Sequence, residues 1–432
     1  MANIRLNTFK EIIDEFHDSE LPAFFSRDLK VDLDINKVMV VYGPRRAGKT
    51  FYCYQLISEL LAHGINKERI LYVNFEDDRL LPLEVKDLRY LLDAYYEKYP
   101  QNQNQLIYLF LDEIQSIPGW EVFVRRIYDK EQVRIIVTGS SSQLLVKDIA
   151  SSIRGRTIRY SVYPLSFREY LRFNGLNLKD DYKESKQRYE IKNLLEKFIM
   201  NGRFPETIQE NTILRESTLQ EYFDLLVYRD LADKFSIKNT DLLKYLLKFL
   251  FTNMAKEFSV NSYYKSIKDQ MSVSKETIND YLAHIQETSY FWLLPKFSYS
   301  LKEQRVNTKK IITIDNGLRN RACFHISADY GRLIENLVGA GLCEQYTDVY
   351  YWKNGSEVDF VTNDRNYLQA INVTSEEGDA EVFKREIKGL TAFKEHFPET
   401  QKLILITKET EGREGDIELI PLWHWLLRSH SC

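Results

Sequence analysis

Short apolar runs alternate along the first part of the chain with stretches in which apolar residues recur every three or four positions. The runs at residues 38–42, 106–112 and 133–139 are almost uninterrupted, which is typical of parallel strands buried on both faces. Residues 70–78 and 157–163 predict two further strands. Strands that alternate with helices predict an α/β domain with a parallel sheet and helices on both faces.

Downstream of this region the pattern changes. Residues 176–193 are charged and poor in apolar positions, which predicts a surface connection, and residues 194–251 carry helical spacing. Residues 260–299 predict two short helices, a turn and a strand, which is the order of a helix-turn-helix with a wing. Further on, a predicted helix at 331–342 precedes the strand-like segments VYYWK, GSEVDFV, LQAINVT and KLILIT.

One loop carries a phosphate-binding motif. GPRRAGKT, residues 43–50, matches G-x-x-x-x-G-K-[ST] and lies between an apolar strand and an amphipathic helix, the context that the motif requires. We expect its N–H groups to bind the phosphates of ATP, Lys49 to reach the β and γ phosphates, and Thr50 to bind Mg²⁺. The alternative is a glycine turn with an unrelated lysine. The predicted nucleotide-binding residues are Gly43, Pro44, Arg45, Arg46, Ala47, Gly48, Lys49, Thr50, Phe51 and Ser140.

Two acids follow the apolar run at 106–112. Asp112 is expected to hold the Mg²⁺ shell through water, as the acid of a Walker B strand does, and Glu113 to orient and activate the attacking water. Strands often end in acids for no catalytic reason, but the phosphate-binding loop makes that interpretation less favoured. Thr138 and Ser140, at the end of another strand, are candidate sensors of the γ-phosphate or else belong to a polar turn.

Composition narrows the class of protein. No run approaches the ~18 apolar residues of a membrane span, and the N-terminus lacks the apolar segment of a signal peptide. Four scattered cysteines fit neither a disulfide framework nor a zinc site, so we expect a cytoplasmic protein without membrane contact. The net charge of −4 argues against nucleic-acid binding by the whole chain. Residues 241–310, however, contain 11 basic and 7 acidic residues, a net of +4.

Five motifs occur in a recognisable order: GPRRAGKT, FLDEIQSIPGW, TGSSSQLL, RGRTIRYSVYPLSFREYL and NGRFPE. Together they resemble the AAA+-like, STAND-related prokaryotic P-loop ATPases, in which a winged helix and a C-terminal domain of unknown function follow the ATPase domain. The resemblance covers nearly the whole chain and implies an additional-strand sheet of order 5-1-4-3-2. It also implies a homo-oligomer in which Arg156 acts as an arginine finger, although spacing alone favours solvated loop residues for Arg154 and Arg156. Arg203 replaces the second glycine of the family's GGxPE-like segment.

The C-terminal helix and strands resemble the core of the PD-(D/E)xK nucleases. In that core, Glu335 corresponds to the helical acid and Asp359 to the first strand acid. Asn372 and Thr374 stand where a further acid and a lysine are expected. Because two acids and a lysine hold Mg²⁺ and activate water in such enzymes, we predict a degenerate site whose fold is kept as a docking surface for a protein partner.

The predicted function is an ATP-hydrolysing molecular switch that couples its nucleotide state to the winged helix and the nuclease-like domain. One alternative is an ATP-gated, metal-dependent nuclease. Another is a DNA-binding regulator that uses ATP as a ligand and faces the groove with Lys275, Thr277, Asn279 and His284. The predicted domains are a P-loop ATPase domain at 1–175, a helical lid at 176–255, a winged helix at 256–325 and a degenerate PD-(D/E)xK-like domain at 326–432.

Overall fold

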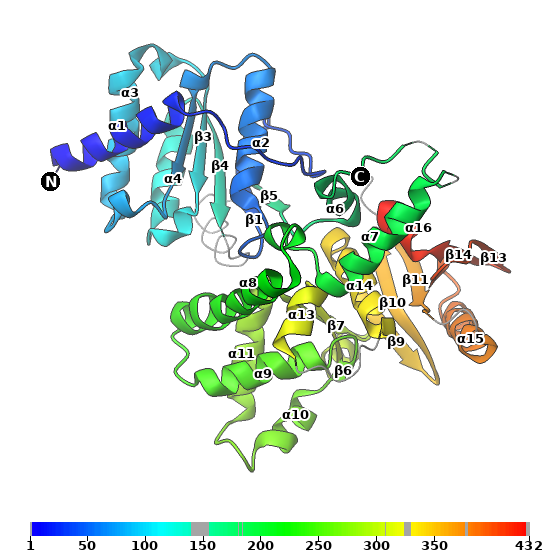
Figure 1. Cartoon of the computed structure of the whole chain (residues 1–432). Helices are drawn as coiled ribbons and strands as arrows, with labels where there is room; N and C mark the ends of the chain where they lie inside the picture. Colours follow the sequence, from blue (N-terminus) through cyan, green and yellow to red (C-terminus); the bar gives the residue numbers. More distant parts are fainter. Residues whose placement is uncertain are drawn as a thin grey trace. The chain divides into compact units, whose positions relative to one another are not determined.

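The structure is a computed structural model that describes residues 2–139, 155–179, 181–183, 185–306, 308–323, 330–375 and 379–428. The chain divides into two compact units, Met1–Tyr163 and Pro164–Cys432 (Figure 1). No helix among the described residues is both long enough and apolar enough to cross a membrane.

The first unit is built on a five-stranded parallel sheet of order β2-β3-β4-β1-β5. Its strands are β1 (Val38–Tyr42), β2 (Ile70–Asn74), β3 (Ile107–Asp112), β4 (Val133–Gly139) and β5 (Thr157–Ser161). The predicted order 5-1-4-3-2 is therefore confirmed, and the unit has the fold of the additional-strand P-loop NTPases. All six residues of β3 are buried, as its uninterrupted apolar run predicts.

Helices cover both faces of this sheet (Figure 1). The core on one face contains residues of α1 (Ala2–Asp18), α3 (Arg89–Lys98) and α4 (Trp120–Lys130), packed on Val38 and Val40 of β1. The core on the other face contains residues of α2 (Lys49–Ala62), packed on Met39 and Val41. Successive residues of β1 thus point to opposite layers, and the carboxyl ends of all five strands share one edge.

Helices form the first part of the second unit. They are α6 (Phe167–Phe173), α7 (Gln187–Asn201), α8 (Thr212–Leu225), a π-helix at Leu226–Asp233 and α9 (Thr240–Thr252). Ser166 and Glu169 form a capping box at the start of α6. The charged segment 176–193 is not a connection throughout, because α7 begins at Gln187 and buries Ile191.

A small antiparallel sheet and short helices follow, with the strand order β6-β8-β7. The elements are β6 (Glu257–Phe258), α10 (Val260–Ile267), α11 (Lys275–Glu287), β7 (Phe291–Pro295), α12 (Leu301–Val306), β8 (Lys309–Thr313) and α13 (Asn316–Ala322). Ser274 caps α11 as predicted, since its hydroxyl accepts a hydrogen bond of 3.1 Å from the N–H of Thr277.

The last part of the unit is a six-stranded sheet of order β13-β14-β12-β11-β10-β9. Its elements are α14 (Tyr330–Gln345), β9 (Val349–Asn354), β10 (Ser356–Asp364), β11 (Tyr367–Val373), α15 (Ala380–His396), β12 (Lys402–Thr407), β13 (Gly412–Glu414), β14 (Ile417–Pro421) and α16 (Leu422–Arg428). β9, β10 and β11 pair antiparallel, whereas β11, β12 and β14 pair parallel. α14 and α15 pack in separate cores, one on Phe360 and the other on Val361 of β10.

A buried ion pair connects three segments of the second unit. The guanidinium of Arg203, just after α7, pairs with Glu344 of α14, and both side chains are almost fully buried. Its Nε also donates a hydrogen bond of 3.0 Å to the carbonyl of Ile314. The preceding Gly202 has a φ of 86°, and a Cβ there would lie 2.4 Å from Oδ1 of Asp315. The arginine in place of the family's second glycine is thus an internal cross-link.

Candidate nucleotide site

The loop between β1 and α2 has little room for larger side chains. A Cβ on Gly43 would lie only 2.0 Å from the carbonyl oxygen of Val162. Arg46 and Gly48 have left-handed backbone angles, with φ of 63° and 94°. α2 begins at Lys49, directly after this turn. The N–H groups and the positive dipole end of the helix therefore meet at the loop, which favours an anion.

Lys49 is buried at this loop. Its Nζ lies 3.3 Å from the carbonyl oxygen of Gly43 and 3.2 Å from that of Pro44. The same atom lies 3.5 Å from Oε1 of Glu113. The side chain is only 4% exposed, so its charge is compensated almost entirely by these oxygens. A phosphate bound to the loop N–H groups would be within the reach of this ammonium.

Asp112 ends β3 beside the first residues of α2. The hydroxyl of Thr50 donates to its Oδ2 at 2.7 Å, and the hydroxyl of Tyr72 donates to the same oxygen at 2.9 Å. The Thr138 hydroxyl donates to the other carboxylate oxygen. Burial raises the pKa of Asp112, although these three donors act in the opposite direction. A hydroxyl and a carboxylate in contact are hard oxygen ligands, and they fit the predicted Mg²⁺ site.

Glu113 has an unusual backbone and a charged environment. Its φ of 55° is left-handed, which is uncommon for a residue other than glycine. Its N–H donates to the Thr138 hydroxyl at 2.9 Å, which fixes this conformation. Burial alone would raise the pKa of Glu113, but Lys49, Gln115 and Arg45 together hold that pKa below its usual value. The side chain is therefore a carboxylate at neutral pH, as a group that orients water must be.

The other residues predicted for the nucleotide site differ in whether they contact the two acids. Thr138 contacts both acids, whereas Ser140 lies outside the described residues. Arg45 forms an ion pair of 3.3 Å with Glu76. Phe51 is half-exposed on α2 and makes an edge-to-face contact with Tyr54.

Arg156 is not near the loop of its own chain. Its carbonyl accepts a hydrogen bond from the N–H of Val38, so it precedes β5 at the edge of the sheet where the strands begin. The loop with Lys49 lies at the opposite edge, where β1 ends. The Arg156 guanidinium pairs with Asp129 at 2.7 Å and is more than half exposed. A role at the γ-phosphate of a neighbouring copy stays a prediction, and Arg154 lies outside the described residues.

Arg27 contacts the loop and was not marked by any sequence motif. Its Nη1 donates to the carbonyl of Ala47 at 2.8 Å, and its Nη2 donates to the carbonyl of Tyr163 at 2.6 Å. Its own N–H donates to Gln55 of α2 at 2.7 Å. Arg27 therefore ties the segment before β1 to the phosphate loop and to the chain after β5, which makes it a positioning residue.

We expect Arg27→Met to weaken ATP binding about tenfold, which corresponds to ~1.4 kcal/mol, because the Ala47 and Tyr163 carbonyls lose their shared donor. Titration with a fluorescent ATP analogue measures this effect. Arg27→Lys keeps the charge but not the fork of donors, so it should restore affinity only in part. An affinity equal to that of the wild type, with only the melting temperature lowered, would leave Arg27 a purely structural role.

Three family models match successive parts of the chain. A family model described as an AAA domain matches residues 35–171, and two described as domains of unknown function (DUF8612 and DUF4143) match residues 192–329 and 330–425. An uncharacterized protein of Methanocaldococcus jannaschii is 33% identical over 441 residues, which cover 97% of this chain and 95% of that protein. An uncharacterized protein of Haemophilus influenzae is 28% identical over 398 residues, or 91% of this chain and 95% of the relative.

Solved structures are more distant. The Walker-type ATPase PABY2304 of Pyrococcus abyssi matches 74% of this chain and 94% of its own, with a TM-score of 0.44 and 12% identity. The Orc1 protein of Aeropyrum pernix, in complex with DNA, matches 74% of this chain and 91% of its own, with a TM-score of 0.30 and 12% identity.

Proposed function

Because the chain belongs to the same family as its uncharacterized relative from Methanocaldococcus jannaschii and carries an AAA domain, we propose that it binds and hydrolyses ATP with Mg²⁺. The observation that carries this proposal is the contact of 2.7 Å between the Thr50 hydroxyl and Asp112, with Glu113 next in sequence and paired to Lys49 at 3.5 Å. Loop, metal ligands and acid thus lie together at the carboxyl edge of the sheet, where ligands bind in such folds.

The Lys49–Glu113 pair gives the site two states. The phosphates of ATP would attract Lys49 away from Glu113, since they bring more negative charge than one carboxylate. Glu113 would then be free to orient a water toward the γ-phosphate, and Mg²⁺ held by Thr50 and Asp112 would neutralise the charge that develops. In the structure, the Glu113 carboxylate is held by Lys49 and Gln115.

The finer part of the proposal is a switch that acts on the second unit. The strand order β6-β8-β7 with α10 and α11 supports a winged helix, because the antiparallel pair β7 and β8 follows the second helix. The order α14-β9-β10-β11-α15-β12 supports a PD-(D/E)xK-like domain. We propose that the nucleotide state changes the conformation of these two parts and thereby their binding to a protein partner.

DNA reading by α11 is less favoured by the geometry. His284 stacks on Phe235, with ring centroids 3.9 Å apart, and so does not face a groove as predicted. The Thr277 hydroxyl lies 3.2 Å from that of Ser274 at the helix cap. Lys275 and Asn279 are exposed, and they are the two of the four predicted contacts that could still reach DNA.

The test is the ATPase rate per subunit as a function of protein concentration, with and without duplex DNA. We expect a rate that rises with concentration, and a loss of about 10³-fold or more in that rate for Arg156→Ala, as for an arginine finger supplied by a neighbour. A rate independent of concentration, together with an unchanged Arg156→Ala variant, would contradict the role of Arg156 in trans. Stimulation by DNA that weakens steeply with salt would favour the DNA-binding alternative.

A further inference from the structure

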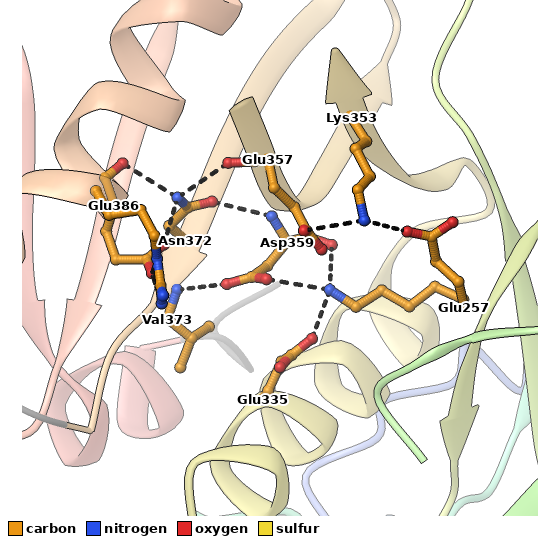
Figure 2. Close-up of polar contacts among 10 residues, drawn as sticks. Glu257, Glu335, Lys353, Glu357, Asp359, Asn372, Val373 and Glu386 are labelled. Atoms are coloured by element: carbon orange, nitrogen blue, oxygen red, sulfur yellow. Dashed lines mark hydrogen bonds and ion pairs between the residues drawn. The ribbon is translucent and has the colours of Figure 1, made fainter. Parts of the chain in front are cut away.

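A second cluster of charged groups lies in the C-terminal part, around Glu335 of α14 and Asp359 of β10 (Figure 2). In a PD-(D/E)xK-like core, two such acids hold a divalent metal ion. Here the nearest cation is an ammonium from another element, Lys310 of β8. No sequence pattern marks this contact, because β8 belongs to the predicted winged helix.

Lys310 is surrounded by oxygen atoms. Its Nζ lies 2.5 Å from Oε1 of Glu335, 3.1 Å from Oδ1 of Asp359 and 3.3 Å from the carbonyl oxygen of Asp359. Its side chain is only 3% exposed. The ammonium therefore donates hydrogen bonds to two oxygens of Asp359 and lies in ion-pair contact with Glu335. Burial alone would lower the pKa of Lys310, but Asp359 and Glu335 hold it above its usual value, and the side chain stays charged.

Other oxygens around the site also have hydrogen-bond partners. Oδ2 of Asp359 accepts a hydrogen bond of 2.9 Å from the N–H of Val373. Asn372, at the position of the missing acid, accepts from the N–H of Asp359 at 2.9 Å and donates to Oε2 of Glu386 at 2.8 Å (Figure 2). Glu386 also pairs with Arg385 at 2.7 Å. Among the described residues no group of three or more acidic, histidine or cysteine side chains is placed to hold a metal.

We propose that Lys310 is the built-in cation of this site, and that its ammonium takes the place of the divalent metal between Glu335 and Asp359. The inference rests on the PD-(D/E)xK-like interpretation of the C-terminal fold and is independent of ATP hydrolysis. A metal could enter only by displacing a buried ammonium and leaving it unpaired, which is costly. In place of a nuclease centre, the native chain therefore has Lys310 enclosed by Glu335 and Asp359, and this cluster connects β8 to α14 and β10.

The experiment measures Mn²⁺ binding to the full chain by calorimetry. Wild type and Asp359→Asn should bind Mn²⁺ equally, because the acid pair is not available. Lys310→Met removes the ammonium and should add one Mn²⁺ site, at least ~10-fold tighter than any background, which Asp359→Asn in the same chain removes again. Lys353→Met is the matched control, since Lys353 also forms an ion pair, with Glu257 at 2.6 Å, but is half-exposed. This variant should add no Mn²⁺ site.

Two outcomes would overturn the proposal. One is Mn²⁺ binding by the wild type that Asp359→Asn abolishes, which would show an open metal site and needs no variant of Lys310. The other is a folded Lys310→Met variant, checked by circular dichroism, without an added site. ATP titration of the same samples reports separately on the Lys49 site, so a failure of the ATPase proposal is distinguishable from a failure of this one.

Discussion

Glu113→Gln is expected to lower the ATP turnover number by about 10²–10⁴-fold while ATP still binds. The amide keeps the size of the side chain and the contact with Gln115, but it cannot accept a proton from the attacking water. Steady-state phosphate release measures turnover, and titration with a fluorescent ATP analogue measures binding. Affinity should stay equal or rise slightly, because Lys49 no longer has to leave a carboxylate to reach the phosphates.

Two further variants make this result specific. Lys49→Ala should abolish ATP binding itself, since it removes the buried ammonium from the loop. Glu76→Gln is the matched control, because Glu76 also pairs with a loop residue, Arg45, but is solvent-accessible. Its turnover should stay close to that of the wild type. Normal turnover in Glu113→Gln would assign the water-orienting role to another group.

Arg203→Met is expected to destabilise the second unit by ~3–5 kcal/mol, because it leaves the Glu344 carboxylate buried without its cation. Urea unfolding followed by tryptophan fluorescence suits this measurement, since four of the five tryptophans, all except Trp120, lie in the second unit. The double variant Arg203→Met with Glu344→Leu should recover much of the loss, because no uncompensated charge remains. A double variant that is less stable than either single variant would mean that the pair contributes through packing and not through charge.

Local patterns predicted the sheet and the nucleotide loop well. The strand order follows from the family resemblance. The contact of Thr50 with Asp112 joins two short motifs, one after β1 and one at the end of β3, which lie on either side of β4. The position of Arg156 relative to the nucleotide loop is also predictable from the sequence. It directly precedes the run that forms β5, and the start of a parallel strand lies opposite the edge where the loop is.

Contacts between distant segments were not predictable. Lys310 reaches Glu335 and Asp359 from a different sheet, and neither its strand nor its neighbours carry a pattern that marks a partner. The positions of Asn372 and Thr374 in the nuclease-like pattern therefore do not predict the cation of this site, because Lys310 comes from β8. Arg27 is likewise not predictable from the sequence, since its role depends on contacts with backbone carbonyls and not on a sequence spacing.

The Arg203–Glu344 pair also constrains how the family can diverge. If only one of the two residues changes, the other is left as an isolated buried charge. A chain with only one of them is therefore expected to be less stable than a chain with both or with neither. Relatives that carry a small residue at the position of Arg203 should therefore lack the acid at the position of Glu344. The two positions, 141 residues apart in the sequence, are expected to vary together. Gly202 is expected to stay glycine, because a Cβ there would lie 2.4 Å from Oδ1 of Asp315.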